Sequence, residues 1–258
     1  MLLLRIVVGI VAGLFAAPLV AGEVRAPRLL EPSPESELST VCKACRHPLR
    51  PDQRWFHFGG TTLRGHCPMC GNSVPVWAAW AEIATLGVGG IVGWRISHWV
   101  WLPAFLLFAF VCVAVVFIDA RLHLIPTKLV YPASGLGLVL LAFAAAVTRD
   151  RERFIWALVG GLGASLFLWI LVLISPAGMG QGDARLSLLL GMFLGWYGWR
   201  YVIYGLFGGF LLGSIGGLFL MARRRGGRKT QIAFGPYLAA GALIVSLWPA
   251  VLNRFLIR

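Results

Sequence analysis

The stretch Leu102-Pro103-Ala104-Phe105-Leu106-Leu107-Phe108-Ala109-Phe110-Val111-Cys112-Val113-Ala114-Val115-Val116-Phe117-Ile118-Asp119 decides the fold class of this chain. It carries no charge before Asp119, and its length approaches the roughly 20 apolar residues that a helix needs to cross a bilayer. Comparable apolar runs occupy residues 3–22, 78–94, 99–118, 129–147, 155–175, 184–198, 201–221 and 232–252. The sequence therefore predicts an all-α polytopic membrane protein with about eight transmembrane helices. The run 184–198 is short and contains glycine, so we expect it to tilt or to enter from an aqueous cavity.

Composition points to the same class. The 258 residues are 59% hydrophobic and only 13% charged, and the mean hydropathy is +0.80, whereas a soluble domain needs a charged surface. The net charge of +13 would suggest nucleic acid in a soluble protein. In a membrane protein, basic residues fix topology and meet anionic head groups, so we expect membrane lipid and no nucleic acid as partner.

The polar region between the first two runs contains four regularly spaced cysteines. Cys42 and Cys45 form one Cys-x-x-Cys pair, and Cys67 and Cys70 form a second. Two such pairs are the usual source of four thiolates for a tetrahedral structural zinc site. Two disulfides are the alternative and require an oxidising compartment. We expect three parts in the chain: a first span (1–22), a cytosolic four-cysteine zinc region (23–77) and a transmembrane core (78–258).

Membrane topology follows from the alternation of eight spans. The cysteine loop, the Asp119 loop, the turn at Asp183 and the loop after 201–221 then lie on one side. Fifteen of the 23 lysines and arginines fall on this side, which predicts that it faces the cytosol. Arg149, Arg151 and Arg153 cluster against this trend on the other side. A cleaved signal peptide at residues 1–22 is the alternative, and it would favour an exported cysteine loop.

Asp119 and Asp183 each lie where an apolar run ends, and ionisable groups at membrane depth are by default functional. If the two carboxyls meet in a partly dry cleft, one keeps a proton while the other remains a base. Such a pair can activate water for amide hydrolysis. Gly178, Gly180 and Gly182 would let an extended peptide approach Asp183 closely.

Other interpretations of these residues remain open. Either aspartate can be a helix cap or an interfacial anchor, although capping its own helix is the wrong polarity for Asp119. The pair can also bind cations or relay protons in a transporter or channel with a zinc-stabilised loop. A third hypothesis is a non-catalytic zinc-binding assembly factor of a secretion machine.

The order of these motifs resembles bacterial type IV prepilin leader peptidases, the bifunctional membrane aspartic proteases of pilus and type II secretion systems. The matching pieces are Asp119 with Ile125-Pro126, the segment Gly178–Leu186, the two Cys-x-x-Cys pairs leading through Gly71 to Glu82, and Phe234-Gly235-Pro236-Tyr237. Together they cover roughly residues 42–245.

The resemblance implies that Asp119 and Asp183 cleave a short basic leader from prepilins or pseudopilins at the cytosolic face of the bacterial inner membrane. It also implies zinc at Cys42, Cys45, Cys67 and Cys70, substrate contacts near Gly180, Gly182, Glu82 and Arg185, and N-methylation with S-adenosylmethionine. Residues 1–41 lack the Gly-Ser-Phe-Leu-Asn-like motif usual in the family, so methylation stays open. Thr127 and Arg185 also depart from the family pattern, where an acidic or amide residue and a lysine are more common. Glu82 can alternatively be a partly buried polar residue of the bundle, and the oligomeric state is not predicted.

Overall fold

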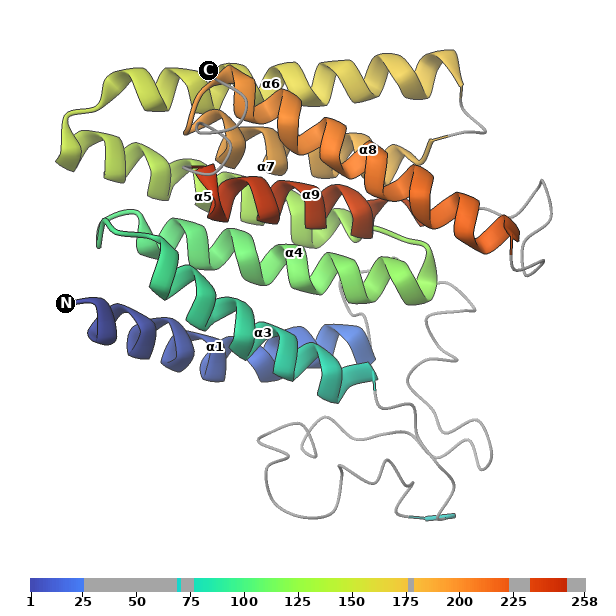
Figure 1. Ribbon diagram of the computed structural model, residues 1–258, viewed down its shortest axis with the longest axis horizontal. Helices are drawn as coiled ribbons and strands as arrows, with labels where there is room; N and C mark the ends of the chain where they lie inside the picture. Colours follow the sequence, from blue (N-terminus) through green and yellow to red (C-terminus); the bar gives the residue numbers. More distant parts are fainter. Residues whose placement is uncertain (26–68, 71–76, 176–178, 223–232, 250–258) are drawn as a thin grey trace.

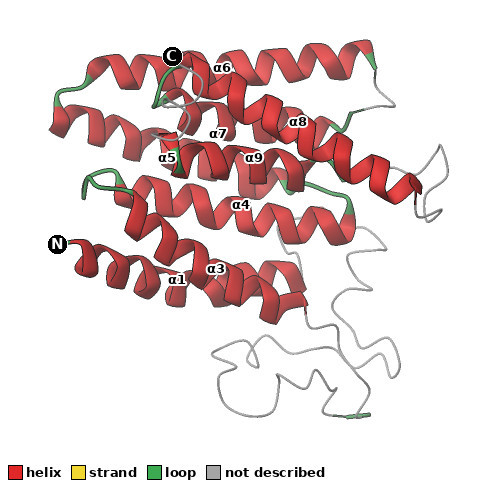
Figure 2. Ribbon diagram, viewed as in Figure 1, coloured by secondary structure: helices red, strands yellow, loops and turns green. Residues whose placement is uncertain are grey.

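A computed structural model describes residues 1–25, 69–70, 77–175, 179–222 and 233–249. These residues form helices and connecting segments, with no strand among them (Figure 2). The helices are α1 (Leu2–Arg25), α3 (Trp77–Arg95), α4 (Leu102–Leu122), α5 (Thr127–Thr148), α6 (Arg151–Ile174), α7 (Gln181–Gly195), α8 (Trp199–Ala222) and α9 (Gly235–Leu247). The predicted all-α class is confirmed for the described part of the chain.

Five of these helices, α1, α4, α5, α6 and α8, are long and apolar enough to cross a membrane. Each of the eight apolar runs read from the sequence overlaps one helix. The expected count of eight crossings stays a prediction for α3, α7 and α9. The run expected at 184–198 is shifted, because α7 begins at Gln181 and ends at Gly195.

The helices form a bundle in which successive helices run in opposite directions (Figure 1). They pack most extensively as the pairs α1 with α3, α6 with α7 and α8 with α9. The last turns of α4, α6 and α8 and the first turns of α5, α7 and α9 lie at the same end of the bundle, on the right in Figure 1. We call this the aspartate end, because Asp119 and Asp183 lie there.

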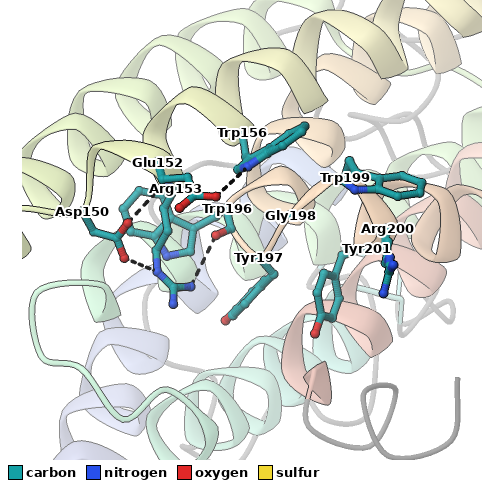
Figure 3. A pocket seen from close by; sticks show the side chains of 10 residues that line it. All are labelled: Asp150, Glu152, Arg153, Trp156, Trp196, Tyr197, Gly198, Trp199, Arg200 and Tyr201. Atoms are coloured by element: carbon teal, nitrogen blue, oxygen red, sulfur yellow. Dashed lines mark hydrogen bonds and ion pairs between the residues drawn. The ribbon is translucent and has the colours of Figure 1, made fainter. Parts of the chain in front are cut away.

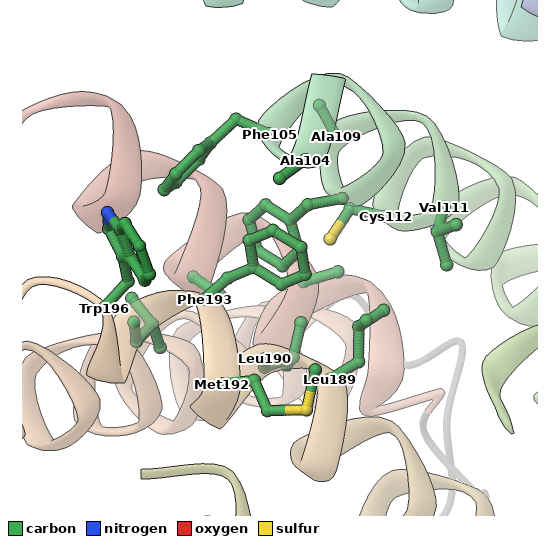
Figure 4. Packing of buried hydrophobic residues seen from close by; sticks show 14 of the residues in the cluster. Ala104, Phe105, Ala109, Val111, Cys112, Leu189, Leu190, Met192, Phe193 and Trp196 are labelled. Carbon is green, nitrogen blue, oxygen red and sulfur yellow. The ribbon is translucent and has the colours of Figure 1, made fainter. Parts of the chain in front are cut away.

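The centre of the bundle is formed largely by α4 and α7. The ring of Phe193 on α7 stacks on Phe108 of α4, with ring centroids 4.5 Å apart. It also meets Phe105 of α4 edge-on, with ring centroids 5.5 Å apart (Figure 4). All three side chains are almost completely buried. By contrast, α5, α6 and α8 expose large apolar side chains such as Val139, Leu162 and Phe207, as expected of helices that face lipid. The two helices that carry the aspartates are therefore shielded from lipid by the others.

Glycine contacts bring α7 unusually close to α6. A Cβ atom added to Gly191 would lie 2.3 Å from the carbonyl oxygen of Gly160, and one added to Gly195 would lie 2.3 Å from that of Trp156. Small residues of this kind let the backbones of two membrane helices approach closely. In lipid the hydrophobic effect does not drive helices together, so close van der Waals contact stabilises the pair instead. The closeness of α6 and α7 therefore requires glycine on the facing sides of both helices.

We predict that Gly191→Ala destabilises the protein by about 1–3 kcal/mol, because the added methyl group has no space beside Gly160. The measurement is thermal unfolding in detergent, where a fall of several degrees is expected. Gly163→Ala on α6 is the matched control, because a Cβ there meets nothing within 4 Å. The control should be neutral or slightly stabilising, since alanine favours helix over glycine. Equal effects of the two variants would contradict close contact at Gly191.

Candidate active site

Asp119 lies three residues before the C-terminal end of α4. The helix stops because His123 adopts a left-handed conformation at φ 54°, and its N–H donates to the carbonyl oxygen of Asp119 at 2.9 Å. Pro126 then disfavours helical geometry at Ile125 and starts α5 as its N-cap. The chain between the two helices is therefore short and fixed, and it holds Ile125 beside the Asp119 carboxyl.

Asp183 lies in the first turn of α7, where Gly180 is the N-cap residue. Its backbone N–H donates to the carbonyl oxygen of Gly180 at 3.1 Å, and its carboxyl also interacts with the Gly180 backbone. Partial positive charge at a helix N-terminus stabilises a carboxylate at this position. Asp183 is only 6% exposed and Asp119 only 4%. Two carboxyls are thus buried at the same end of the bundle.

Ile125 packs where the three segments of the site converge. A Cβ atom on Gly182, at the start of α7, would lie 2.9 Å from the Cβ of Ile125. A Cβ atom on Gly235, at the start of α9, would lie 2.9 Å from Ile125 Cδ1 and 2.6 Å from Asp119 Oδ2. The Ile125 side chain therefore fills the space between α7 and α9, and glycine at 182 and 235 leaves room for it and for the carboxyl of Asp119.

The two carboxyls lie near enough for the charge of Asp119 to act on Asp183. Burial, and then the Asp119 charge, raise the pKa of Asp183 to about 7, and interaction with the Gly180 backbone opposes this shift. The backbone N–H of Gly235 lies against the Asp119 carboxyl. Oδ2 of Asp119 is buried without a hydrogen-bond partner among the described residues. An acceptor atom is thus available for a water or a substrate group.

The aspartates are recessed below the ends of the outer helices. Ser165 Oγ on α6 donates to the carbonyl oxygen of Ala184 at 3.3 Å, which sets Ala184 level with Ser165, yet α6 continues to Ile174. Gly213 on α8 packs against the Phe234 ring, yet α8 continues to Ala222. Nine further residues of helix correspond to about 13 Å. Two long helices therefore extend well past the site.

Arg185 is half-buried and holds the first turn of α7 against α5. Its guanidinium donates to Thr127 Oγ1 at 2.8 Å and to Gln181 Oε1 at 3.4 Å. The two positions that departed from the family pattern in the sequence are thus hydrogen-bonded to each other. A threonine hydroxyl can accept from a guanidinium without placing another negative charge beside the aspartates.

The other predicted site residues are placed as follows. Glu82 is half-buried in the first part of α3, at the aspartate end. Cys70 is exposed, whereas Cys42, Cys45, Cys67 and Gly178 lie outside the described residues. Among the residues that the structure does describe, no group of three or more His, Cys, Asp or Glu side chains is arranged to hold a metal ion.

Two positions that complete the site were not among the predicted site residues. Ile125 and Gly235 occur in the sequence only as parts of short motifs, and apolar residues give no chemical signal of a site. Their proximity to Asp119 depends on how α9 packs against α4. The arrangement as a whole, two buried carboxyls of which Asp183 has a raised pKa, is suited to acid–base activation of water.

We predict that the carboxyl pair titrates with its upper step near pH 7, because burial and the Asp119 charge both disfavour ionisation of Asp183. Asp119→Asn removes the Asp119 charge, so the titration of Asp183 that remains should move to lower pH. The protonated carboxyl can be followed by its infrared C=O stretch. Glu152→Gln, an exposed carboxylate in α6, is the control and should leave the step in place. An unchanged step in Asp119→Asn would mean that the two carboxyls do not interact.

The chain is similar in sequence to proteins of one known family. Residues 106–220 match the model of the type IV leader peptidase family. A prepilin leader peptidase/N-methyltransferase of Pseudomonas aeruginosa is 30% identical over 239 residues, which is 90% of this chain and 81% of that protein. Proteins of the same name from Pseudomonas putida (29% identity; 81% and 72% coverage) and Neisseria gonorrhoeae (28%; 91% and 79%) are also similar. No match to a solved structure was found.

Proposed function

Because the chain belongs to the type IV leader peptidase family, we propose that it is a prepilin peptidase that removes the leader peptide from prepilins or pseudopilins. The relatives support this by name, since each is a prepilin leader peptidase/N-methyltransferase. They give no support to a transporter or channel. The single structural observation that supports the proposal most is the convergence of two buried carboxyls at one end of the bundle.

In the proposed reaction, Asp119 and Asp183 share one proton. The ionised carboxyl takes a proton from a water molecule, and the protonated carboxyl donates a hydrogen bond to the scissile carbonyl oxygen. The water oxygen adds to the carbonyl carbon, and the tetrahedral intermediate then collapses as the leaving nitrogen receives a proton. No covalent bond to the enzyme forms. The raised pKa of Asp183 supports this proton sharing at neutral pH.

The neighbours of the pair take different roles in this proposal. Gly180 contacts substrate in this proposal, because its missing side chain leaves the Asp183 carboxyl accessible. A Cβ atom added to Gly180 would lie 3.3 Å from Asp183 Oδ2. Gly182 instead accommodates Ile125. Arg185 positions α7 through its hydrogen bond to Thr127 and need not touch substrate. Glu82 has the charge to attract a basic leader at the same end of the bundle.

We further propose that the protein lies in the bacterial inner membrane with the aspartate end toward the cytosol. The excess of lysine and arginine in the loops at that end supports this orientation. A prepilin carries its basic leader in front of an apolar helix, so the substrate would approach from within the lipid. The leader would then reach the aspartates from that side of the membrane, below the ends of α6 and α8.

The four-cysteine region (residues 23–77) is proposed as a cytosolic zinc-binding part between a first span (1–22) and the catalytic core (78–258). The support is the donor set, since four thiolates in two Cys-x-x-Cys pairs match tetrahedral zinc. N-methylation with S-adenosylmethionine is a second proposed activity, and the relatives' names favour it.

We predict that Asp119→Asn and Asp183→Asn each reduce leader removal by about 10³-fold, because an amide cannot exchange the required proton. The assay is incubation of the detergent-purified protein with a prepilin, read as the mass of the new N-terminus. The same spectrum reports an added methyl group when S-adenosylmethionine is present.

The control for the aspartate variants is Glu152→Gln, which removes a carboxylate in the first turn of α6, at the end of the bundle opposite to the aspartate end. It should process prepilin at the wild-type rate. Thermal unfolding verifies that each variant is folded. Full processing by both asparagine variants would exclude the aspartate pair as the catalytic groups. No processing by the wild-type protein would favour a non-catalytic assembly role.

We predict that Cys70→Ser lowers the zinc content of the purified protein, since one of four thiolates is lost. Metal analysis by mass spectrometry measures the ratio of zinc to protein. Cys112→Ser is the control, because Cys112 is buried within α4, and zinc should be retained there. A wild-type protein free of zinc after purification without chelators would refute the zinc site.

A further inference from the structure

Two adjacent cavities lie at the end of the bundle opposite to the aspartates. The first, about 400 Å³, opens between the start of α6 and the turn from α7 to α8 (Figure 3). The second, about 370 Å³, lies beside the connection from α3 to α4. Arg153, Tyr197 and Tyr201 line both cavities, so the two lie side by side, and we treat them together as one site. Arg153 belongs to the arginine cluster that the topology prediction left unexplained.

The walls of this site contain buried donors that are not satisfied. Trp196 lines the first cavity and Trp101 the second. Trp196 is fully buried and Trp101 is 9% exposed, yet neither indole Nε1 has a hydrogen-bond partner within the described part of the chain. An indole N–H can only donate. A buried donor without an acceptor is costly, so two of them beside one cavity indicate a ligand that accepts hydrogen bonds.

The arginines of the site have donor capacity to spare. Arg95 uses Nε for the carbonyl oxygen of Leu247 at 2.8 Å, and no hydrogen bond from its two terminal nitrogens is found among the described residues. Arg153 uses Nε for Asp150 and Nη1 for the carbonyl oxygen of Trp196 at 3.5 Å. Both arginines line the second cavity together with Tyr197.

The acidic side chains at the site are already engaged. Asp150 caps α6 and binds Arg153, and Glu152 accepts from the indole of Trp156 at 3.3 Å. Arg200 adds a further positive charge to the first cavity. Over both cavities, three arginines (Arg95, Arg153, Arg200) face two carboxylates, and the site has more donors than acceptors, which favours an anion with several acceptor oxygens. Guanidinium forks bind phosphate in this way.

The surroundings identify the source of that phosphate. Tryptophans with exposed rings surround the site at the helix ends: Trp94, Trp99 and Trp199. Tryptophan gathers at the level of lipid head groups, where one face of the ring is apolar and the N–H meets water. The site thus lies at head-group depth beside helices that face lipid. We propose that it binds the phosphodiester head group of an anionic phospholipid, in the leaflet opposite to the aspartate end.

The test uses the full chain, delipidated in dodecyl maltoside and titrated with phosphatidylglycerol, phosphatidylcholine or inorganic phosphate. Thermal unfolding and native mass spectrometry report stabilisation and bound lipid. We expect phosphatidylglycerol to stabilise the protein and to remain bound, with phosphatidylcholine and free phosphate far weaker. Arg95→Gln and Arg153→Gln should each weaken phosphatidylglycerol binding by about tenfold, since each loses a charged donor fork.

Arg151→Gln is the matched control, because Arg151 is exposed at the start of α6 and lines neither cavity. It removes the same charge from the same end and should bind phosphatidylglycerol normally. Arg95→Gln keeps the test valid if loss of the Asp150 ion pair unfolds Arg153→Gln. Equal binding of phosphatidylcholine, or equal stabilisation by free phosphate, would overturn the lipid assignment. Equal loss in Arg151→Gln would reduce the effect to general surface charge and would overturn the site.

Discussion

The contact between the glycine faces of α6 and α7 is the constraint on which the rest of the structure depends. Gly160 and Gly191 bring two backbones together with no side chain between them. This contact holds α7, a short helix of 15 residues, inside the bundle. The free backbone N–H and C=O groups at the ends of so short a helix could not form hydrogen bonds with lipid. Phe193 on the opposite face of α7 then stacks on Phe108 of α4. The two helices that carry Asp183 and Asp119 are thereby fixed relative to each other from both sides.

The positions of the helices could be predicted from the sequence, because apolar runs bounded by charges and prolines have few other solutions in a membrane. Their closeness could not be predicted. Ile125 fills a space between Gly182 and Gly235, and nothing in an isoleucine flanked by Leu124 and Pro126 identifies it as the contact of three segments. The aspartates were recognisable because carboxyls at the ends of apolar runs are rare, whereas the groups that position them are ordinary apolar residues and glycines.

Arg153 and Arg185 show the same limit for charged residues. From the sequence, Arg153 counted only as a positive charge on the less basic side, and Arg185 as a substitution for lysine. In the structure, Arg153 spans from Asp150 to Trp196 and covers the ring of Trp101 at 4.9 Å, and Arg185 pairs with Thr127. A guanidinium has five donors in a fixed plane, so its role depends on which acceptors the fold brings to it. The number of lysines and arginines in each loop predicts membrane topology, but it does not identify those acceptors.

The overhang of α6 and α8 above the aspartates sets a length requirement on any peptide that reaches them. A polypeptide descending about 13 Å needs about nine residues as a helix but only about four as an extended strand. A helix is also about 10–12 Å wide with its side chains, whereas a single strand is narrow enough to pass between neighbouring helix ends. A substrate of the proposed reaction that enters between α6 and α8 would therefore unwind for roughly one helical turn next to the scissile bond, so the stretch around that bond should be poor in strong helix formers.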